Sequence, residues 1–490
     1  MRELLSRVQK EWQREAPELA TPEPTASSPL LCLTARCAVT SPRGIACLLD
    51  EKLAGERLYF APPARAGVTS FAAVGRGEAV RLAADGRAAL AELTTASTLI
   101  LSSLIEHRGP GCAAAPSPRL YGGLRFDRAP NHVTATASSD VPRDAFDPWR
   151  SFADASFVLP RWLLLSDGES TYLQLAVEPV ELRHSSLWQE LQLIESLVQA
   201  DTAHPSTAPQ LLVREKQAHA VETESAEQQY CALVRAALAE ISAGSLRKVV
   251  AARQLQLEAD RPFSIPSILG ILDHSYSDCQ RFAIEREGAV FVGATPELLI
   301  ARQGRKVVTE ALAGTRPRVA GSDEESVKQD LLADDKERRE HDLVIGAIVE
   351  SLQPFCATFP KIEPTKVRSL RNVHHLWTPI RGELATDQHV LALLLALHPT
   401  PAVCGLPATA AARFLSTHER LDRGYYAAPV GYFDAHGNGE FWVAIRSALV
   451  CGQRAWLYAG AGVVAGSSPE SEYRETAVKL AAMRAALGAS

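Results

Sequence analysis

The chain has 490 residues, of which 46% are hydrophobic and 22% are charged. These ordinary globular values exclude a disordered, fibrous or low-complexity protein, and the length allows about three ordinary domains or one large domain with extensions. The chain carries 51 Lys and Arg against 57 Asp and Glu, a net charge of −6 that argues against nucleic-acid binding, because a phosphate backbone requires a basic surface.

The first 210 residues alternate short apolar runs with turn signals, which predicts a β-rich part with a few helices. Segments rich in Pro, Gly and Ser predict loops at 21–29, 109–118 and 203–209. This part contains no group of residues that points to chemistry. We therefore divide the chain into an N-terminal part, 1–210, and a second part, 211–490, that holds the candidate site.

The second part begins with helical spacing of apolar residues from about Ser225, which Gly244 ends. Residues 248–259 follow as a strand, and a pair of strands brackets Gly288. A long helix is expected over about 325–352.

The last hundred residues contain further strand patterns, with a hairpin turn at 436–439. A final helix starts at Ser468-Pro469, because Ser is a favoured N-cap and Pro suits the first turn. Strand pairs followed by helices, without regular βαβ alternation, predict an α+β fold with large, mainly antiparallel sheets.

The nine cysteines are scattered and form no CxxC pair, which predicts reduced thiols in a cytoplasmic protein rather than disulfides or structural zinc. The N-terminal segment MRELLSRVQKEWQRE lacks an apolar signal core. The longest apolar run, VLALLLAL at 390–397, is far shorter than the roughly 20 residues that span a bilayer. We expect neither export nor a membrane anchor.

Two predicted helices carry acidic stripes. Glu337, Glu340 and His341 share one stripe with apolar residues, namely Val344, Ile348 and Leu352. The alternative is a solvated helix start, where acids are favoured.

On the last helix, Glu472 and Glu475 share a stripe with Lys479 and Met483. An exposed Glu475–Lys479 pair explains this helix equally well in isolation. Two inward acidic stripes, however, provide the carboxylate ligands that Mg²⁺ prefers.

Lys248 stands beside Val249 and Val250, either as an edge residue or as an enclosed amine that acts as a general base. Glu297, in GATPELL, is either a turn residue or an enclosed general acid. Arg446 lies in an apolar run and is able to bind a substrate carboxylate if it points inward.

Glycines interrupt two strands, at Gly314-Thr315 and at Gly460-Ala461-Gly462. Glycine allows a ligand to approach the backbone closely, although a β-bulge explains either position alone.

Nine segments carry a resemblance. KVVAAR, GATPELL, TEALAGTR, KERREHDLV, LHPTPAVCGLP, GYYAAPVG, VAIRSA, YAGAGVVAGSSPESEYRET and VKL occur in this order over residues 245–480. The set resembles the chorismate-utilising enzymes, which include isochorismate, salicylate, anthranilate and aminodeoxychorismate synthases. The resemblance implies a two-layered, mainly antiparallel β-sheet core flanked by helices, and a monomer that depends on Mg²⁺ and acts on chorismate.

The resemblance also implies a role for each matching residue. Lys248 matches the general base that activates water for attack at C2, and Glu297 matches the general acid that protonates the departing C4 hydroxyl. The acids match the metal site, with Glu340 and Glu475 as magnesium ligands and Glu337 and Glu472 beside them. The matching substrate contacts are Gly314, Thr315, His375, Ala402, Val403, Tyr426, Arg446, Gly460, Ala461, Gly462 and Lys479.

Lys248 resembles the water-using members rather than the ammonia-using ones. Salicylate-forming relatives tend to have Thr at the position of Ala402 and Lys at that of Ala408. We therefore expect an isochorismate synthase. The alternatives are a salicylate synthase, a silent chorismate-binding module and a glutamine-dependent amino-transferring subunit.

Overall fold

The computed structural model describes residues 1–15, 29–37, 44–63, 70–86, 89–126, 147–203, 218–221, 225–318 and 323–489. The predicted loops at 21–29 and 203–209, and the boundary at 210, fall almost entirely outside these ranges. The predicted loop at 109–118 is irregular. This loop prediction is therefore confirmed.

Strands dominate the described chain. They are β1 (Leu31–Cys37), β2 (Arg57–Ala61), β3 (Ala72–Ala84), β4 (Ile105–Arg108), β5 (Arg119–Leu124), β6 (Ala155–Ser166), β7 (Thr171–Val177), β8 (Ala218–Val221), β9 (Lys248–Ala259), β10 (Gln280–Arg286), β11 (Ala289–Thr295), β12 (Leu298–Gln303), β13 (Lys306–Pro317), β14 (Lys361–Ile362), β15 (Lys366–Ser369), β16 (Val373–Glu383), β17 (Gly405–Leu406), β18 (Pro429–Asp434), β19 (Gly439–Val443), β20 (Ser447–Cys451) and β21 (Arg454–Val463).

Helices flank the strands. The α-helices are α1 (Arg2–Glu15), α2 (Ala89–Ser103), α3 (Ser185–Ala203), α4 (Ala226–Ser242), α5 (Ile265–Ser275), α6 (Glu324–Ala333), α7 (Asp335–Leu352), α8 (Val390–Leu397), α9 (Ala408–His418) and α10 (Pro469–Ala486). Short 3₁₀ helices occupy Gly44–Leu49, Pro179–Arg183 and Gln353–Phe355. None of the helices described is long and apolar enough to cross a membrane.

One hydrogen-bonded sheet runs through both parts of the chain and divides at β6. One side of β6 pairs with β3, from which the first arm continues as β2, β10, β11, β20, β21 and β9. The other side of β6 pairs with β7 and with β5, and from β5 the second arm continues as β18, β19, β12, β13 and β16. Among the described strand pairs, β1 and β4 alone are parallel. The predicted α+β class is confirmed.

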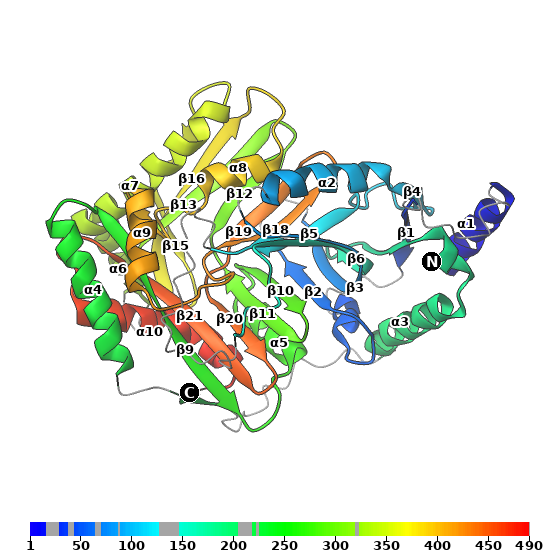
Figure 1. The fold of residues 1–490 in the computed structure, drawn as a ribbon, viewed down its shortest axis with the longest axis horizontal. Helices are drawn as coiled ribbons and strands as arrows, with labels where there is room; N and C mark the ends of the chain where they lie inside the picture. The colour runs from blue at the N-terminus through cyan, green and yellow to red at the C-terminus, as the bar shows by residue number, and fades with distance from the viewer. Residues whose placement is uncertain are drawn as a thin grey trace.

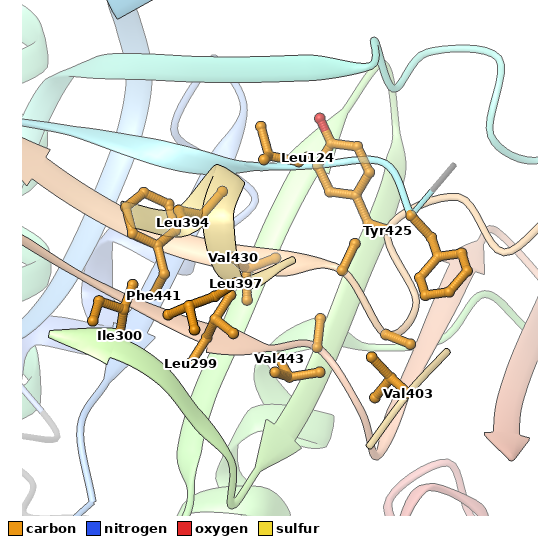
Figure 2. Packing of buried hydrophobic residues seen from close by; sticks show 14 of the residues in the cluster. Leu124, Leu299, Ile300, Leu394, Leu397, Val403, Tyr425, Val430, Phe441 and Val443 are labelled. Atoms are coloured by element: carbon orange, nitrogen blue, oxygen red, sulfur yellow. The ribbon is translucent and has the colours of Figure 1, made fainter. Parts of the chain in front are cut away.

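Alternation along the strands divides the core in two. In β11, Phe291 joins a core that contains side chains of both arms, whereas Val290 and Val292 face a second core beneath α5 and α10. Figure 2 shows part of the first core, where leucines of α8 meet β12, β18 and β19. Figure 1 shows α4, α6, α7, α9 and α10 at one end of the molecule, and α1 and α3 at the other.

The predicted long helix over 325–352 is wrong, because the chain forms two helices. The Asp334 side chain accepts hydrogen bonds from the backbone N–H groups of Lys336 and Glu337, at 2.9 and 3.1 Å. Asp334 therefore caps α7 and ends α6, since its extended backbone cannot continue a helix. The other predicted elements, including the strand 248–259, the turn at 436–439 and the Ser468 cap, are confirmed.

Candidate active site

A cavity of about 850 Å³, including the space at its mouth, lies at the end of the molecule where α7 packs against β13 and α10 packs against β21. Most of the predicted site residues line it. They are Glu297, Gly314, Thr315, Glu337, Glu340, His375, Ala402, Val403, Tyr426, Arg446, Gly460, Gly462, Glu472, Glu475 and Lys479. Two predicted residues, Lys248 and Ala461, do not line it directly.

Lys248 lies at the start of β9, which pairs with β21 on one side and with β17 on the other. It is therefore not an edge residue, and 1% of its side chain is exposed. Its Nζ donates a hydrogen bond of 2.8 Å to Oε1 of Glu340, which does line the cavity. Burial alone would raise the pKa of Glu340, but the charge and hydrogen bond of Lys248 hold it below its usual value.

The alternation of β21 explains why Ala461 is absent from the lining. Gly460 and Gly462 share one face of the strand, and Ala461 is buried on the opposite face. At Gly462, a Cβ atom would lie 2.9 Å from Oε1 of Glu340 and 3.2 Å from Cε of Lys248. A side chain at this position would therefore displace the Lys248–Glu340 pair, which occupies the space beside the glycine.

Glu297 lies between β11 and β12, in the short link that the hydroxyl of Thr295 and the backbone of Val443 hold in place. Its side chain is buried at the cavity wall. Burial, followed by the charge of Glu310, raises the pKa of Glu297 to about 8, although Lys248, Lys479 and Arg446 oppose the shift. Such a carboxyl group holds its proton at neutral pH.

Three cationic side chains line the cavity, and two of them, Lys479 and Arg446, belong to the predicted set. Lys479, on α10, donates to the carbonyl oxygen of Gly460 at 2.9 Å and forms an ion pair of 2.7 Å with Glu475. Arg446 follows β19 and has φ +53°, a left-handed backbone conformation that costs about 1–2 kcal/mol in a non-glycine residue. The fold maintains this strained position, and burial lowers the pKa of Arg446.

His375, on β16, connects Arg446 to the glycine bulge of β13. Its Nδ1 lies 3.2 Å from the carbonyl oxygen of Gly314 and 3.1 Å from the hydroxyl of Thr315, and its Nε2 lies 3.5 Å from Nη2 of Arg446. Burial, followed by the charges of Arg446 and Lys479, lowers the pKa of His375 well below its usual value. The ring is therefore neutral, and the carbonyl oxygen of Gly314 favours a proton on Nδ1.

The four acidic side chains come from the first two turns of α7 and α10. Burial, followed by the charge of Glu340, raises the pKa of Glu337, and Glu475 on the other helix adds to the shift. Burial, followed by the charge of Glu475, raises the pKa of Glu472 to about 7. The two helices therefore bring repelling carboxylates to one wall.

Carboxylate oxygens that repel one another fit a hard divalent cation in their chemistry. The positions of these carboxylates, however, do not form a complete set of metal ligands. Within the residues described, no three His, Cys, Asp or Glu side chains form a group that could hold one metal ion. Lys248 engages Glu340 and Lys479 engages Glu475.

Several lining residues were missed by the sequence analysis, and they are Val250, Leu312, Ala313, Lys336, Ala427, Ile445, Tyr458 and Ala459. Tyr458 had a usable signal, because it shares the strand face of Gly460 and Gly462. For Lys336, the available signal was its position directly before the predicted residue Glu337. Ala427 has φ +61°, and no sequence signal predicts this for alanine.

Comparisons with known proteins found a matching family and similar relatives. A family model described as chorismate binding enzyme matches residues 20–488. The salicylate biosynthesis isochorismate synthase of Pseudomonas aeruginosa is 38% identical over 381 residues, which cover 76% of this chain and 75% of that protein. Isochorismate synthase MenF of Bacillus subtilis is 34% identical over 376 residues and 76% of each chain.

The fold has a solved counterpart in the menaquinone-specific isochorismate synthase MenF of Escherichia coli. That structure superposes with a TM-score of 0.71 at 24% identity, covering 99% of this chain and 100% of that one. The family match extends over nearly the whole chain, and so the protein belongs to the chorismate-binding enzymes.

Proposed function

We propose that the protein is an isochorismate synthase that converts chorismate reversibly to isochorismate. The observation that carries the proposal is a buried carboxyl group in the cavity wall, Glu297, that stays protonated near neutral pH. It is accompanied by the buried amine of Lys248, which is hydrogen-bonded to the lining residue Glu340. The relatives that cover three quarters of the chain are isochorismate synthases by name.

The reaction exchanges a hydroxyl group between two ring carbons. A water molecule adds its oxygen at C2, and its proton passes to the side-chain amine of Lys248. Lys248 acts as the base only after it has given up the proton that it holds in the ion pair with Glu340. Glu297 gives its proton to the C4 hydroxyl, which leaves as water. One water enters and one leaves, so the reaction is an isomerisation without redox change. A base and an acid are both required. Water is a weak nucleophile unless a base takes its proton, and a hydroxyl group is a poor leaving group unless an acid protonates it.

The charges of the cavity suit a small dicarboxylate. Arg446 and Lys479 provide two cations, and an arginine is able to bind a carboxylate with two parallel hydrogen bonds. We propose Glu340 and Glu475 as ligands of Mg²⁺, with Glu337 and Glu472 beside them. When bound, Mg²⁺ would neutralise a substrate carboxylate and fix its orientation.

The wall at Ala402 and Val403 favours release of isochorismate over further reaction. Both residues line the cavity with small apolar side chains, which offer no group that promotes loss of pyruvate. The alternative is a salicylate synthase, and the identity of the products distinguishes the two functions.

Incubation of the full-length protein with chorismate and Mg²⁺, followed by chromatography of the products, tests the proposal. Isochorismate is expected, with salicylate and pyruvate appearing after addition of an isochorismate-specific lyase. Salicylate without that lyase would support the alternative. An aminated product formed with ammonia, or chorismate binding without turnover, would refute the proposal.

Two variants test the assigned roles. Lys248→Ala and Glu297→Gln are each expected to lower kcat by roughly 100- to 10,000-fold, the range for loss of a general base or acid. Their circular dichroism should match that of the wild type. Activity within a few-fold of wild type in either variant would refute its role.

We further propose that the enzyme works as a monomer in the cytoplasm. None of the nine cysteines, all in described positions, forms a disulfide, which suits a reducing compartment. Size-exclusion chromatography with light scattering tests the monomer.

A further inference from the structure

Two tyrosines form a stacked wall of the cavity. The rings of Tyr426 and Tyr458 lie with centroids 5.2 Å apart and planes at 20°, and both line the cavity. A Cβ atom at Gly460 would approach the hydroxyl of Tyr426 to 3.3 Å. Tyr458 and Gly460 share β21, and the carbonyl of Gly460 accepts the hydrogen bond from Lys479. A shift of Tyr458 would therefore move several groups that face the cavity.

Trp149, from the N-terminal part of the chain, supports this wall from behind. Its indole Nε1 donates a hydrogen bond of 3.0 Å to the hydroxyl oxygen of Tyr458, across 309 residues of sequence. Trp149 is 1% exposed and does not line the cavity. The hydrogen bond fixes the hydroxyl end of Tyr458 on the side that faces away from the cavity.

The same indole also fixes the segment that carries Tyr426. A Cβ atom at Gly424 would lie 2.1 Å from the Trp149 ring, so the backbone of Gly424 rests directly on the indole. Gly424 has φ +51°, and a glycine adopts this conformation without strain. The next residue, Tyr425, stacks on Trp149 at 6.1 Å and donates to the carbonyl of Ala153 at 3.0 Å. Figure 2 shows Tyr425 among the buried side chains of the first core.

The residue on the other side of Gly424, Arg423, supports two more residues that line the cavity. Arg423 donates to the carbonyl oxygens of Val403 and Val250 at 2.9 and 2.8 Å. Both of these residues line the cavity, and Val250 stands two positions after Lys248 on β9. The segment that rests on Trp149 is thus connected through Arg423 to two further lining residues, Val403 and Val250.

We propose that Trp149 is a positioning residue, which holds the Tyr458–Tyr426 wall in the place that chorismate binding requires. The inference rests on the proposed function and gives the N-terminal part a role in it. Trp149 acts through Tyr458 and Gly424, not by touching the substrate.

The test is a double-mutant cycle in the full-length protein. Trp149→Phe removes the N–H donor and keeps an aromatic ring, and Tyr458→Phe removes the acceptor. Each is expected to raise KM for chorismate, and to weaken chorismate binding measured by calorimetry, by roughly 2- to 10-fold, the ratio that one neutral hydrogen bond supplies. The kcat should stay within about twofold, because a displaced wall weakens binding of substrate and transition state alike. The double variant should be no worse than either single one.

Trp162→Phe is the matched control. Trp162 is also buried, and its Nε1 donates a hydrogen bond of 2.8 Å to Glu190, but it lies in the second core away from the cavity. It should lower the melting temperature and leave KM unchanged. Trp149→Phe with a lower melting temperature but wild-type KM and chorismate affinity would overturn the proposal, as would additive effects in the cycle.

The two proposals fail in distinguishable ways. A wild-type protein without turnover refutes the proposed function, and the calorimetric affinities then decide the role of Trp149. Equal affinity in the wild type and in Tyr458→Phe refutes the role of Trp149 even when the wild type is fully active. Tyr458→Phe also provides the answer if Trp149→Phe does not fold.

Discussion

Glu297 binds a proton more tightly in the folded chain than in the unfolded chain. Its pKa is about 8 when folded, against about 4.3 for an ordinary glutamate. Between these values the folded state holds a proton that the unfolded state has released, so the free energy of unfolding falls as pH rises through this interval. Below pH 4 both states are protonated and the stability is fully present.

We therefore expect Glu297→Gln to stabilise the protein increasingly from pH 5 to pH 8, by an amount on the order of a few kcal/mol, because glutamine has no proton to release. Urea unfolding at both pH values measures the difference. Glu227→Gln, on the exposed face of α4, is the control, since surface substitutions change stability by less than about 0.5 kcal/mol. A stabilisation that is independent of pH would contradict the prediction.

Gly462 leaves space for the ion pair of Lys248 and Glu340. In Gly462→Ala the new methyl group would displace the pair, and we expect turnover to fall roughly 10- to 100-fold, as for a small misplacement of a catalytic group. The matched control is Gly346→Ala in α7, where a Cβ atom would meet nothing within 4 Å. This control should gain about 0.5–1 kcal/mol of stability from helix propensity. Initial rates and thermal unfolding separate the two results, and an active Gly462→Ala would show that the pair tolerates movement.

At the scale of elements, Asp334 decides where α7 begins, and α7 carries Glu337 and Glu340. The hydrogen bond from the backbone of Glu337, together with Arg316, lowers the pKa of Asp334. A carboxyl group with a lowered folded pKa contributes stability that is present above its ordinary pKa of about 3.9 and is lost as pH falls through the folded value.

We expect Asp334→Ala to cost about 1 kcal/mol at pH 7, and to cost less at pH 3, where the wild type has lost part of the same contribution. Chemical unfolding at the two pH values provides the comparison. Asp334→Asn retains an oxygen acceptor but loses the charge, so its cost at pH 7 should be smaller than that of Asp334→Ala without being zero. Equal losses for alanine and asparagine would show that the cap does not stabilise α7.

The elements show what local patterns can and cannot predict. The strand at 248–259 and the cap at Ser468 follow from local chemistry, and the structure begins both elements at the expected residue. The break at Asp334 does not follow from the sequence, because the charged run DDKERRE is equally typical of the solvated face of one continuous helix. The pairing of Lys248 with the two-residue strand β17 likewise depends on a partner distant in sequence.

At the scale of the whole molecule, both parts of the chain contribute to one sheet. β5 pairs with β18, β2 pairs with β10, and Phe157 contacts Phe433 with ring centroids 5.1 Å apart. A fragment of residues 211–490 would therefore expose two strand edges and half of a core.

We expect that fragment to aggregate or remain unfolded when expressed alone, and to be recovered in folded form when co-expressed with residues 1–210. Size-exclusion chromatography and circular dichroism measure both outcomes. A monomeric, cooperatively unfolding fragment would show that the second part is an independent domain.

The site was largely predictable because most of its residues lie in contiguous motifs with a strong resemblance. The rest depended on tertiary contacts. Tyr458 entered the cavity wall through alternation along β21, which the sequence does show, whereas Trp149 supports it from a position 309 residues away. The left-handed backbone of Ala427 and Arg446 is likewise set by neighbouring strands rather than by residue type.

The ion pairs of Glu340 with Lys248 and of Glu475 with Lys479 have a consequence for metal affinity. A divalent ion that enters this cavity does not meet bare negative charge, since it has to compete with two tethered ammonium groups for the same oxygens. Its affinity would therefore be the difference between two ionic interactions, and a lysine that it displaced would become available to the substrate.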